Sequence, residues 1–197
     1  LPWGLLHLLW PFFVQNLIIG YFWYRRIRCL EAFCTDNLTI KNRSVDPTPA
    51  TRDWIARFFA IHYGAFHLAY LIALVVLTTV SSRRHDQALP DDSPWLVIGV
   101  VTPADLVFML VIAISFYFSH RQAFAAQVAA DRSRKPDIGR LMILPYARVL
   151  PMHMVLVLSP ALGQTSMTWL YATLKAIADG LMHWVEQRWM ASSKSQT

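Results

Sequence analysis

Five long apolar stretches of 18 to 25 residues dominate this 197-residue sequence. A helix needs about 20 apolar residues to cross the roughly 30 Å hydrocarbon core of a bilayer. Hydrophobic residues make up 55% of the chain and Asp, Glu, Lys and Arg only 15%, and a soluble chain this short has too little interior to bury so much apolar surface. The sequence therefore predicts one all-α membrane domain, a polytopic bundle of about five transmembrane helices in contact with the lipid bilayer.

The predicted membrane spans cover residues 3–24, 58–80, 95–118, 141–158 and 166–190. A polar loop, residues 25–57, follows the first span. The third span is interrupted by Pro103 and Asp105. The fourth contains Pro145 and Pro151, so we expect it to be kinked or irregular, because proline removes a backbone hydrogen bond from a helix.

The connections between these spans alternate in charge. They contain seven, two, five and no Lys or Arg in chain order. Cytoplasmic loops carry the excess of basic residues in membrane proteins, which places the first and third connections in the cytoplasm. Five spans then put the N-terminus outside and the C-terminus inside. The net charge of +6 is explained by this topology, so we do not expect a nucleic-acid partner.

Ionisable side chains at membrane depth are the candidates for function, because they are costly there unless they are paired or hydrated. The predicted topology places His62, His120 and His183 in or near the inner part of the bundle, and His153 closer to its centre. His67 lies about 140° around the helix from His62 and clusters with other aromatic residues. We therefore favour His62 as the functional residue of the second span.

A polar stripe follows the fifth span, where Lys175, Asp179 and His183 are spaced four residues apart and so share one face. In lipid, such a stripe is expected to face other helices. Lys175, Asp179 and Arg148 can alternatively form an ion-pair network that only fixes the register of the helices.

Two further residues have both a structural and a functional interpretation. Tyr146 shares a face of the fourth span with His153. Asn16, in the first span, can hydrogen-bond across a helix interface or orient an imidazole ring.

These positions fall into ordered blocks that resemble an uncharacterised family of prokaryotic integral membrane proteins, the domain of unknown function 6498. The blocks are Gln15-Asn16-Leu17-Ile18-Ile19-Gly20, His62-Tyr63-Gly64 with Phe66, Ser119-His120, Pro145-Tyr146-Ala147-Arg148-Val149 with His153, and Lys175 with Asp179 and His183. Members of the family usually have Glu where Gln15 stands, and a Gly pair near Ser159-Pro160. The resemblance implies the fold, these candidate residues and the bacterial inner membrane, but no activity.

The leading functional hypothesis is a metal- or haem-binding membrane protein. Imidazole binds Zn, Cu, Fe and haem iron, and the predicted ligands are His62, His120, His153 and His183. Asn16, Tyr146 and Asp179 are expected to hold the second nitrogen of these rings. The sequence contains no Gly-rich phosphate loop and no Gly-x-Ser-x-Gly or His-Glu-x-x-His motif, so no catalytic residue is assigned.

Two alternatives belong to other functional classes. The chain can be a non-catalytic accessory subunit of a respiratory or photosynthetic membrane complex, or a homo-oligomer, in which buried polar residues organise packing. It can also be a small transporter or proton pathway built on Lys175, Asp179 and His183, although the absence of repeated halves is unusual for a transporter.

Overall fold

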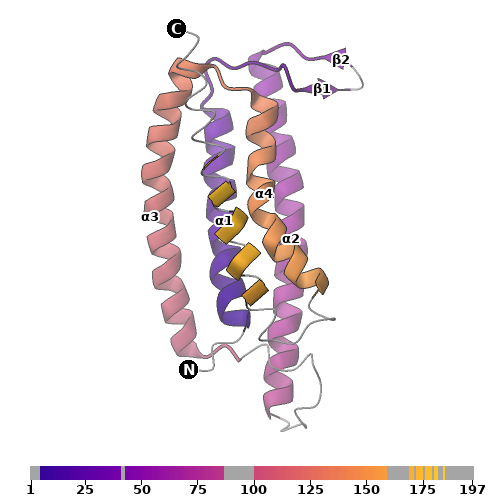
Figure 1. Cartoon of the computed structure of the whole chain (residues 1–197), viewed down its shortest axis with the longest axis vertical. Coiled ribbons are helices and arrows are strands. Elements are labelled where there is room, and N and C mark those ends of the chain that lie inside the picture. Colours follow the sequence, from indigo (N-terminus) through magenta and orange to yellow (C-terminus); the bar gives the residue numbers. More distant parts are fainter. Residues whose placement is uncertain are drawn as a thin grey trace.

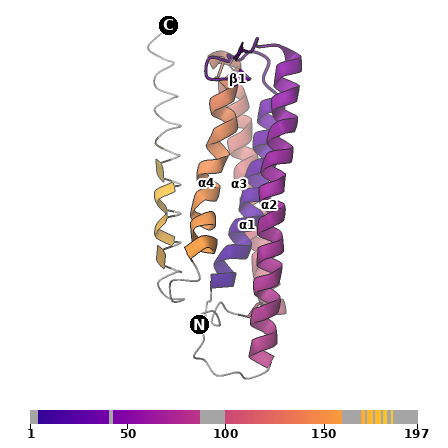
Figure 2. The same ribbon diagram turned by 90° about the vertical axis from the view of Figure 1, so that its right-hand side faces the viewer.

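The computed structural model describes residues 5–40, 43–86 and 100–158, together with residues 169–170, 172–174, 176–178, 180–181 and 184. Four helices follow one another along the chain: α1 (Leu5–Arg28), α2 (Pro49–Asp86), α3 (Pro103–Arg134) and α4 (Ile138–Leu158). The described residues between Trp169 and Trp184 are also helical. The long helices lie side by side and run alternately up and down (Figures 1 and 2), which confirms the predicted all-α bundle.

Helix α1 is the centre of the bundle and packs against α2, α3 and α4. Its side chains Leu6, Leu9 and Ile27 are fully buried. Within the described residues, three helices, α1, α2 and α3, are long and apolar enough to cross a membrane. Half of the apolar window of α1 is buried inside the protein, whereas none of the window of α3 is. The apolar surface of α3 is therefore left for lipid.

Helix α2 begins nine residues before the predicted span. Thr48 provides its N-terminal cap, because the Thr48 hydroxyl accepts a hydrogen bond of 3.2 Å from the backbone N–H of Thr51, and Pro49 suits the first helical position. The 38 residues of α2 extend over about 57 Å, nearly twice the thickness of a bilayer core. The helix is therefore longer than a bilayer core is thick, and its first nine residues lie in what the sequence predicted as loop.

Helix α3 begins at Pro103, where the sequence predicts an interruption of the third span. Thr102 and Asp105 form a capping box, with each side chain accepting a hydrogen bond from the backbone of the other, and Pro103 occupies the first turn. The helix continues to Arg134, so the predicted connection 119–140 shortens to a turn of residues 135–137. Lys135 ends the helix in the left-handed conformation, with φ of 46°.

Helix α4 contains both Pro145 and Pro151 and still forms one helix. Its ribbon changes direction along its length (Figure 1), as expected for a helix that lacks two backbone donors.

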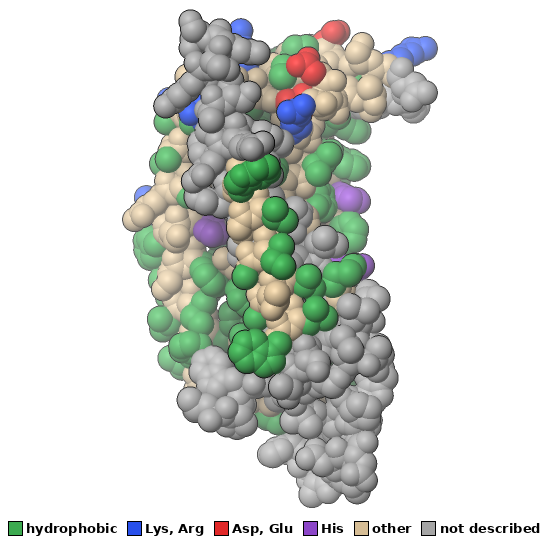
Figure 3. Space-filling model, viewed as in Figure 1, with side chains coloured by type: hydrophobic (Ala, Val, Ile, Leu, Met, Phe, Trp, Pro, Cys, Tyr) green, Lys and Arg blue, Asp and Glu red, His purple; other side chains and the backbone are tan. Residues whose placement is uncertain are grey.

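The two most basic connections lie at the same end of the bundle. The backbone N–H of Cys34 donates to the carbonyl of Pro136 at 3.1 Å, and the N–H of Ile138 donates to the carbonyl of Cys34 at 3.0 Å. A short antiparallel hairpin, β1 (Thr39–Ile40) and β2 (Arg43–Ser44), belongs to this end. Among the described side chains, Figure 3 shows charged groups at this end and hydrophobic groups over the middle of the visible face.

Candidate functional site at the seam between helices α2 and α4

Two tyrosine–histidine hydrogen bonds join α2 to α4 in a reciprocal arrangement. His62 on α2 bonds through Nδ1 to the Tyr146 hydroxyl on α4 at 2.8 Å. Tyr70 on α2 bonds through its hydroxyl to Nδ1 of His153 on α4 at 2.9 Å. We call these the two Tyr–His pairs. Each helix contributes one tyrosine and one histidine, and the rings of both histidines are exposed.

The spacing of these residues along the helices explains why the pairs align. His62 and Tyr70 are eight residues apart, and Tyr146 and His153 are seven apart, so each couple lies on one helical face. From the first pair to the second, the residue number increases on both helices, because α2 and α4 run in the same direction (Figure 2). The pairs are therefore separated by roughly 11 Å along the helix axes.

Aromatic rings surround the first pair. Tyr146 packs edge-on against Phe59, Tyr63 and Phe66, with ring centroids 6.1, 5.6 and 6.3 Å away. His62 also stacks on Phe58, at 5.4 Å between centroids. This packing restricts the Tyr146 ring and so directs its hydroxyl toward His62.

A third histidine, His67, lies between the two pairs along α2 and is only 2% exposed. Its ring stacks on Tyr63, with centroids 4.2 Å apart, and its Nδ1 lies 2.8 Å from the Tyr63 carbonyl. A carbonyl only accepts hydrogen bonds, so Nδ1 carries the proton. Nε2 of His67 is buried and has no hydrogen-bond partner among the described residues.

His67 is a candidate that the sequence did not single out. The sequence indicated that His67 clusters with other aromatic residues, and the ring centroids of Tyr63 and Tyr70 do lie 4.2 and 6.1 Å from that of His67. It nevertheless favoured His62 as the functional residue of this helix. The available signal was the run of ring-bearing residues at helical spacing through this part of α2. Asn16 supports the same cluster from α1, because its backbone carbonyl accepts a hydrogen bond of 2.9 Å from the Tyr63 hydroxyl.

The other predicted site residues are placed as follows. His120 is half-buried on α3, a helix that packs against α1. Arg148 lies in α4, but its side chain is outside the described part of the structure. Lys175, Asp179 and His183 lie outside the described residues. The structure thus associates His62 with Tyr146 and His153 with Tyr70, and the four-histidine ligand set remains a prediction.

One group of potential metal ligands does come together in the described part of the chain, outside the membrane spans. Ligand atoms of Cys34, Asp36 and Asp137 lie within 4.8 Å of one another. Asp137 already has a structural role, because it accepts hydrogen bonds from the backbone N–H of Arg140 at 2.8 Å and of Asn37 at 3.0 Å. Burial, together with a hydrogen bond to Asp36, raises the pKa of the Cys34 thiol and so disfavours the thiolate that a metal requires.

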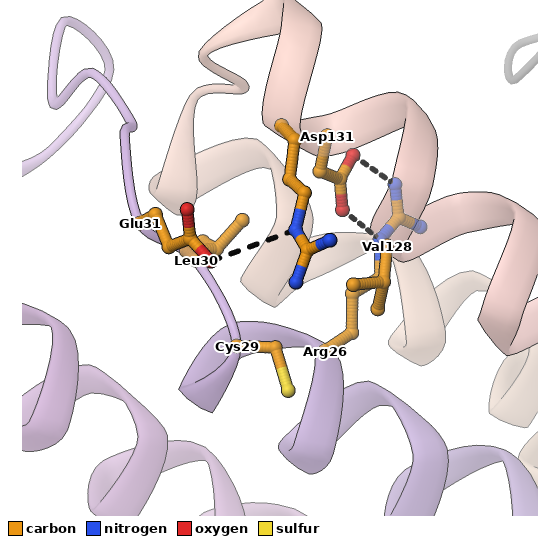
Figure 4. Close-up of a pocket in the computed structure, with 7 residues that line it drawn as sticks. Arg26, Cys29, Leu30, Glu31, Val128 and Asp131 are labelled. Carbon is orange, nitrogen blue, oxygen red and sulfur yellow. Dashed lines mark hydrogen bonds and ion pairs between the residues drawn. The ribbon is translucent and has the colours of Figure 1, made fainter.

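The basic end of the bundle is held by a largely buried ion pair. Arg26 of α1 forms two hydrogen bonds with the carboxylate of Asp131 on α3, at 2.6 and 2.8 Å. The two side chains are 12% and 9% exposed. Figure 4 shows this ion pair. A second ion pair lies beside it, in which Arg132 Nε is 3.5 Å from Glu31 Oε1. These residues line a small pocket with Cys29, Leu30 and Val128.

Comparison with known proteins adds a family but no activity. A family model described as a family of unknown function (DUF6498) matches residues 1–196. No curated protein and no solved structure matches the chain. The match covers nearly the whole sequence and agrees with the resemblance seen in its ordered blocks, so the chain belongs to this family of unknown function.

Proposed function

We propose that the protein is a multi-pass membrane protein that passes protons along the seam between α2 and α4. The observation that carries this proposal is the reciprocal pair of tyrosine–histidine hydrogen bonds between α4 and α2, the latter a helix long and apolar enough to cross a membrane. Tyrosine hydroxyls and imidazoles both donate and accept hydrogen bonds, and histidine gains and loses a proton near neutral pH.

Each pair supplies one step of a relay. A proton that arrives at Nε2 of His62 makes the ring doubly protonated. The ring then gives its Nδ1 proton to the Tyr146 oxygen, while the Tyr146 hydroxyl proton leaves for the next acceptor, to which we assign Nε2 of His67; His62 is left neutral with its proton on Nε2. The Tyr70–His153 pair repeats this chemistry further along the seam. Polar groups of this kind are expensive in lipid and are retained for a function.

The distance between the pairs requires an intermediate group. Roughly 11 Å of helix is too far for direct transfer, and His67 lies between His62 and Tyr70. Its Nε2, buried and without a hydrogen-bond partner among the described residues, is an acceptor for a proton delivered from either side. We therefore assign His67 as the central group of the pathway. The alternative pathway on Lys175, Asp179 and His183 concerns residues outside the described part of the structure.

The orientation in the membrane is part of the same proposal. The two most basic connections share one end of the bundle, and basic loops favour the cytoplasm. We place this end in the cytoplasm of the bacterial inner membrane, with the N-terminus outside and the C-terminus inside. Cysteine labelling from outside is then expected to reach positions introduced in residues 81–94 and to miss those introduced in the turn 135–137.

Proton flux into liposomes tests the pathway. The purified protein is reconstituted with an internal pH-sensitive dye, and an inward potential is imposed with potassium and valinomycin. We expect His67→Gln and His153→Gln to reduce flux roughly tenfold or more, as for other lost proton-transfer groups. His120→Gln, on α3, is the matched control and is expected to retain flux. Wild-type protein that conducts no better than empty liposomes excludes the proposal.

Metal or haem binding is the second candidate, and one observation favours it. Both His62 and His153 use Nδ1 for a tyrosine hydroxyl, which leaves Nε2 available, and metal-binding histidines usually have their other nitrogen held in this way. The predicted ligands are His62, His120, His153 and His183, with Zn, Cu, Fe or haem iron. Elemental analysis and an absorption spectrum of the purified protein test this candidate. A protein with neither flux nor metal leaves the accessory-subunit role.

A further inference from the structure

The exposed surface along the contact between α1 and α3 presents two arginines, Arg25 and Arg121, beside exposed aromatic rings; we call this surface the groove between α1 and α3. On α1, the guanidinium carbon of Arg25 lies 5.9 Å from the ring centroid of Tyr21 and 5.2 Å from that of Phe124 on α3. Tyr21 is 48% exposed and Tyr117, on α3, is 40% exposed. The stacked guanidinium therefore borders an open surface and not the core.

Arg121 of α3 lies on the same side of the groove. The Phe22 ring packs against both Tyr117 and Phe124, with centroids 5.5 Å away in each case, so the turn of α3 between them lies alongside α1. Arg121 belongs to that turn, and its spacing from Tyr117 and Phe124 puts the three on one face of the helix. Helical geometry points Arg121 toward the side of the groove that Arg25 occupies.

Arg25 and Arg121 differ from the neighbouring arginines in their ion pairs. Arg26, Arg28 and Arg132 each approach a carboxylate, of Asp131, Asp53 and Glu31 respectively. Arg25 and Arg121 are exposed, and within the described part of the chain neither has a carboxylate in ion-pair distance. The groove therefore carries two positive charges that the protein itself does not neutralise.

The groove becomes apolar on the side that faces the middle of the bilayer. Leu17 lies two turns before Arg25 on the same face of α1 and is 42% exposed, and Ile114 lies two turns before Arg121 on α3 and is 48% exposed. Arg25 directly follows the first apolar stretch, and Arg121 comes three residues after the third. The arginines are thus at the boundary between apolar and charged surface.

We propose that this groove binds an anionic phospholipid. The headgroup phosphate is held between the guanidinium groups of Arg25 and Arg121, which present paired donors suited to phosphate oxygens. Tyr21 and Tyr117 occupy the level of the headgroups, where amphipathic rings are favoured. One acyl chain follows the groove past Leu17 and Ile114. The unneutralised charge, the aromatic border and the apolar track together fit a lipid and not a free anion.

Native mass spectrometry of the detergent-purified protein tests this site. The protein is titrated with phosphatidylglycerol, with phosphatidylcholine as the zwitterionic lipid, and bound lipids are counted. We expect one phosphatidylglycerol to bind more tightly than the rest. In Arg25→Gln/Arg121→Gln its apparent affinity is expected to fall roughly thirtyfold, from the usual contribution of basic residues at a membrane surface. Arg25→Lys/Arg121→Lys, which keeps the charge but not the paired donors, is expected to fall between.

The matched control is Arg43→Gln/Arg57→Gln, which removes two exposed positive charges from the same end of the bundle. Helical circular dichroism verifies the fold of each variant. Equal weakening by the two glutamine double variants overturns the site, because it shows general attraction of charge alone. Displacement of the tight lipid by millimolar inorganic phosphate also overturns it, in favour of a simple anion site.

Discussion

The interfaces of α1 and the seam between α2 and α4 differ in the kinds of side-chain contact that they contain. The α1 interfaces bury Leu6, Leu9 and Ile27 completely and enclose the Arg26–Asp131 ion pair. The seam is instead joined by hydrogen bonds of exposed histidines. Side-chain hydrogen bonds between membrane helices contribute on average only about 0.6 kcal/mol. The comparison teaches that the α1 interfaces combine buried apolar contacts with a buried ion pair, whereas the hydrogen bonds of the two Tyr–His pairs add little to stability.

The largest expected effect comes from breaking the buried ion pair. Asp131→Asn leaves the Arg26 charge without its partner in a mostly buried position, which costs roughly 3 kcal/mol. Thermal unfolding in detergent measures the loss. Glu31→Gln is the control, because the Arg132–Glu31 side chains are 64% and 70% exposed and such pairs contribute about 0–1 kcal/mol. Similar losses in both variants contradict a special role for α1.

The next effect concerns the close contact between Gly20 of α1 and Tyr63 of α2. A Cβ added at Gly20 collides with the Tyr63 ring, whereas one added at Gly64 meets nothing within 4 Å. We expect Gly20→Ala to destabilise the protein by roughly 1–3 kcal/mol through overpacking, with Gly64→Ala neutral or slightly stabilising. Chemical denaturation of both variants provides the measurement. A neutral Gly20→Ala shows that α1 and α2 can separate without cost.

Removing a tyrosine hydroxyl from the seam is expected to change proton flux much more than stability. Tyr146→Phe and Tyr70→Phe keep the rings and delete only the hydrogen bond to His62 or His153. Each is expected to cost about 1 kcal/mol or less in stability and nevertheless to reduce proton flux strongly. Stability and flux are measured on the same preparation. A large loss of stability with unchanged flux assigns the pairs to folding instead.

The smallest effect is a difference in thiol reactivity at the basic end. Cys29 is exposed and Cys34 half-buried, and burial raises the pKa of Cys34. A raised pKa means less thiolate at neutral pH, so Cys34 is expected to react with iodoacetamide more slowly than Cys29 at pH 7.5 and to accelerate as the pH rises. Mass spectrometry of digested protein gives both rates. Faster modification of Cys34 contradicts its burial.

The class of fold was predictable from the sequence, but the ends of its helices were not. Hydropathy locates the part of a helix in lipid, and it suggested an interruption at Pro103 and Asp105 and a loop before Phe58. The helices begin instead at caps, Thr102 and Thr48, because the backbone N–H groups of a first turn need acceptors wherever the membrane boundary lies. Hydropathy has no information about that requirement.

Part of the candidate site was predictable from the sequence, but its arrangement was not. The sequence singled out His62, Tyr146 and His153, and placed the last two on one helical face. Pairing His153 with Tyr70 requires the relative register of α2 and α4, which is determined by packing between helices. The ligand set of His62, His120, His153 and His183 depends on the same missing information.

The backbone hydrogen bonds of Cys34 with Pro136 and Ile138 make the two ends of the seam different. Backbone hydrogen bonds fix the start of α4 to the loop after α1, so this end of α4 is held in place. Tyr146 is about 12 Å and His153 about 22 Å along the helix from Ile138. A small rocking of α4 about this end would displace His153 nearly twice as far as Tyr146, so we expect such a motion to open the Tyr70–His153 contact before the His62–Tyr146 contact.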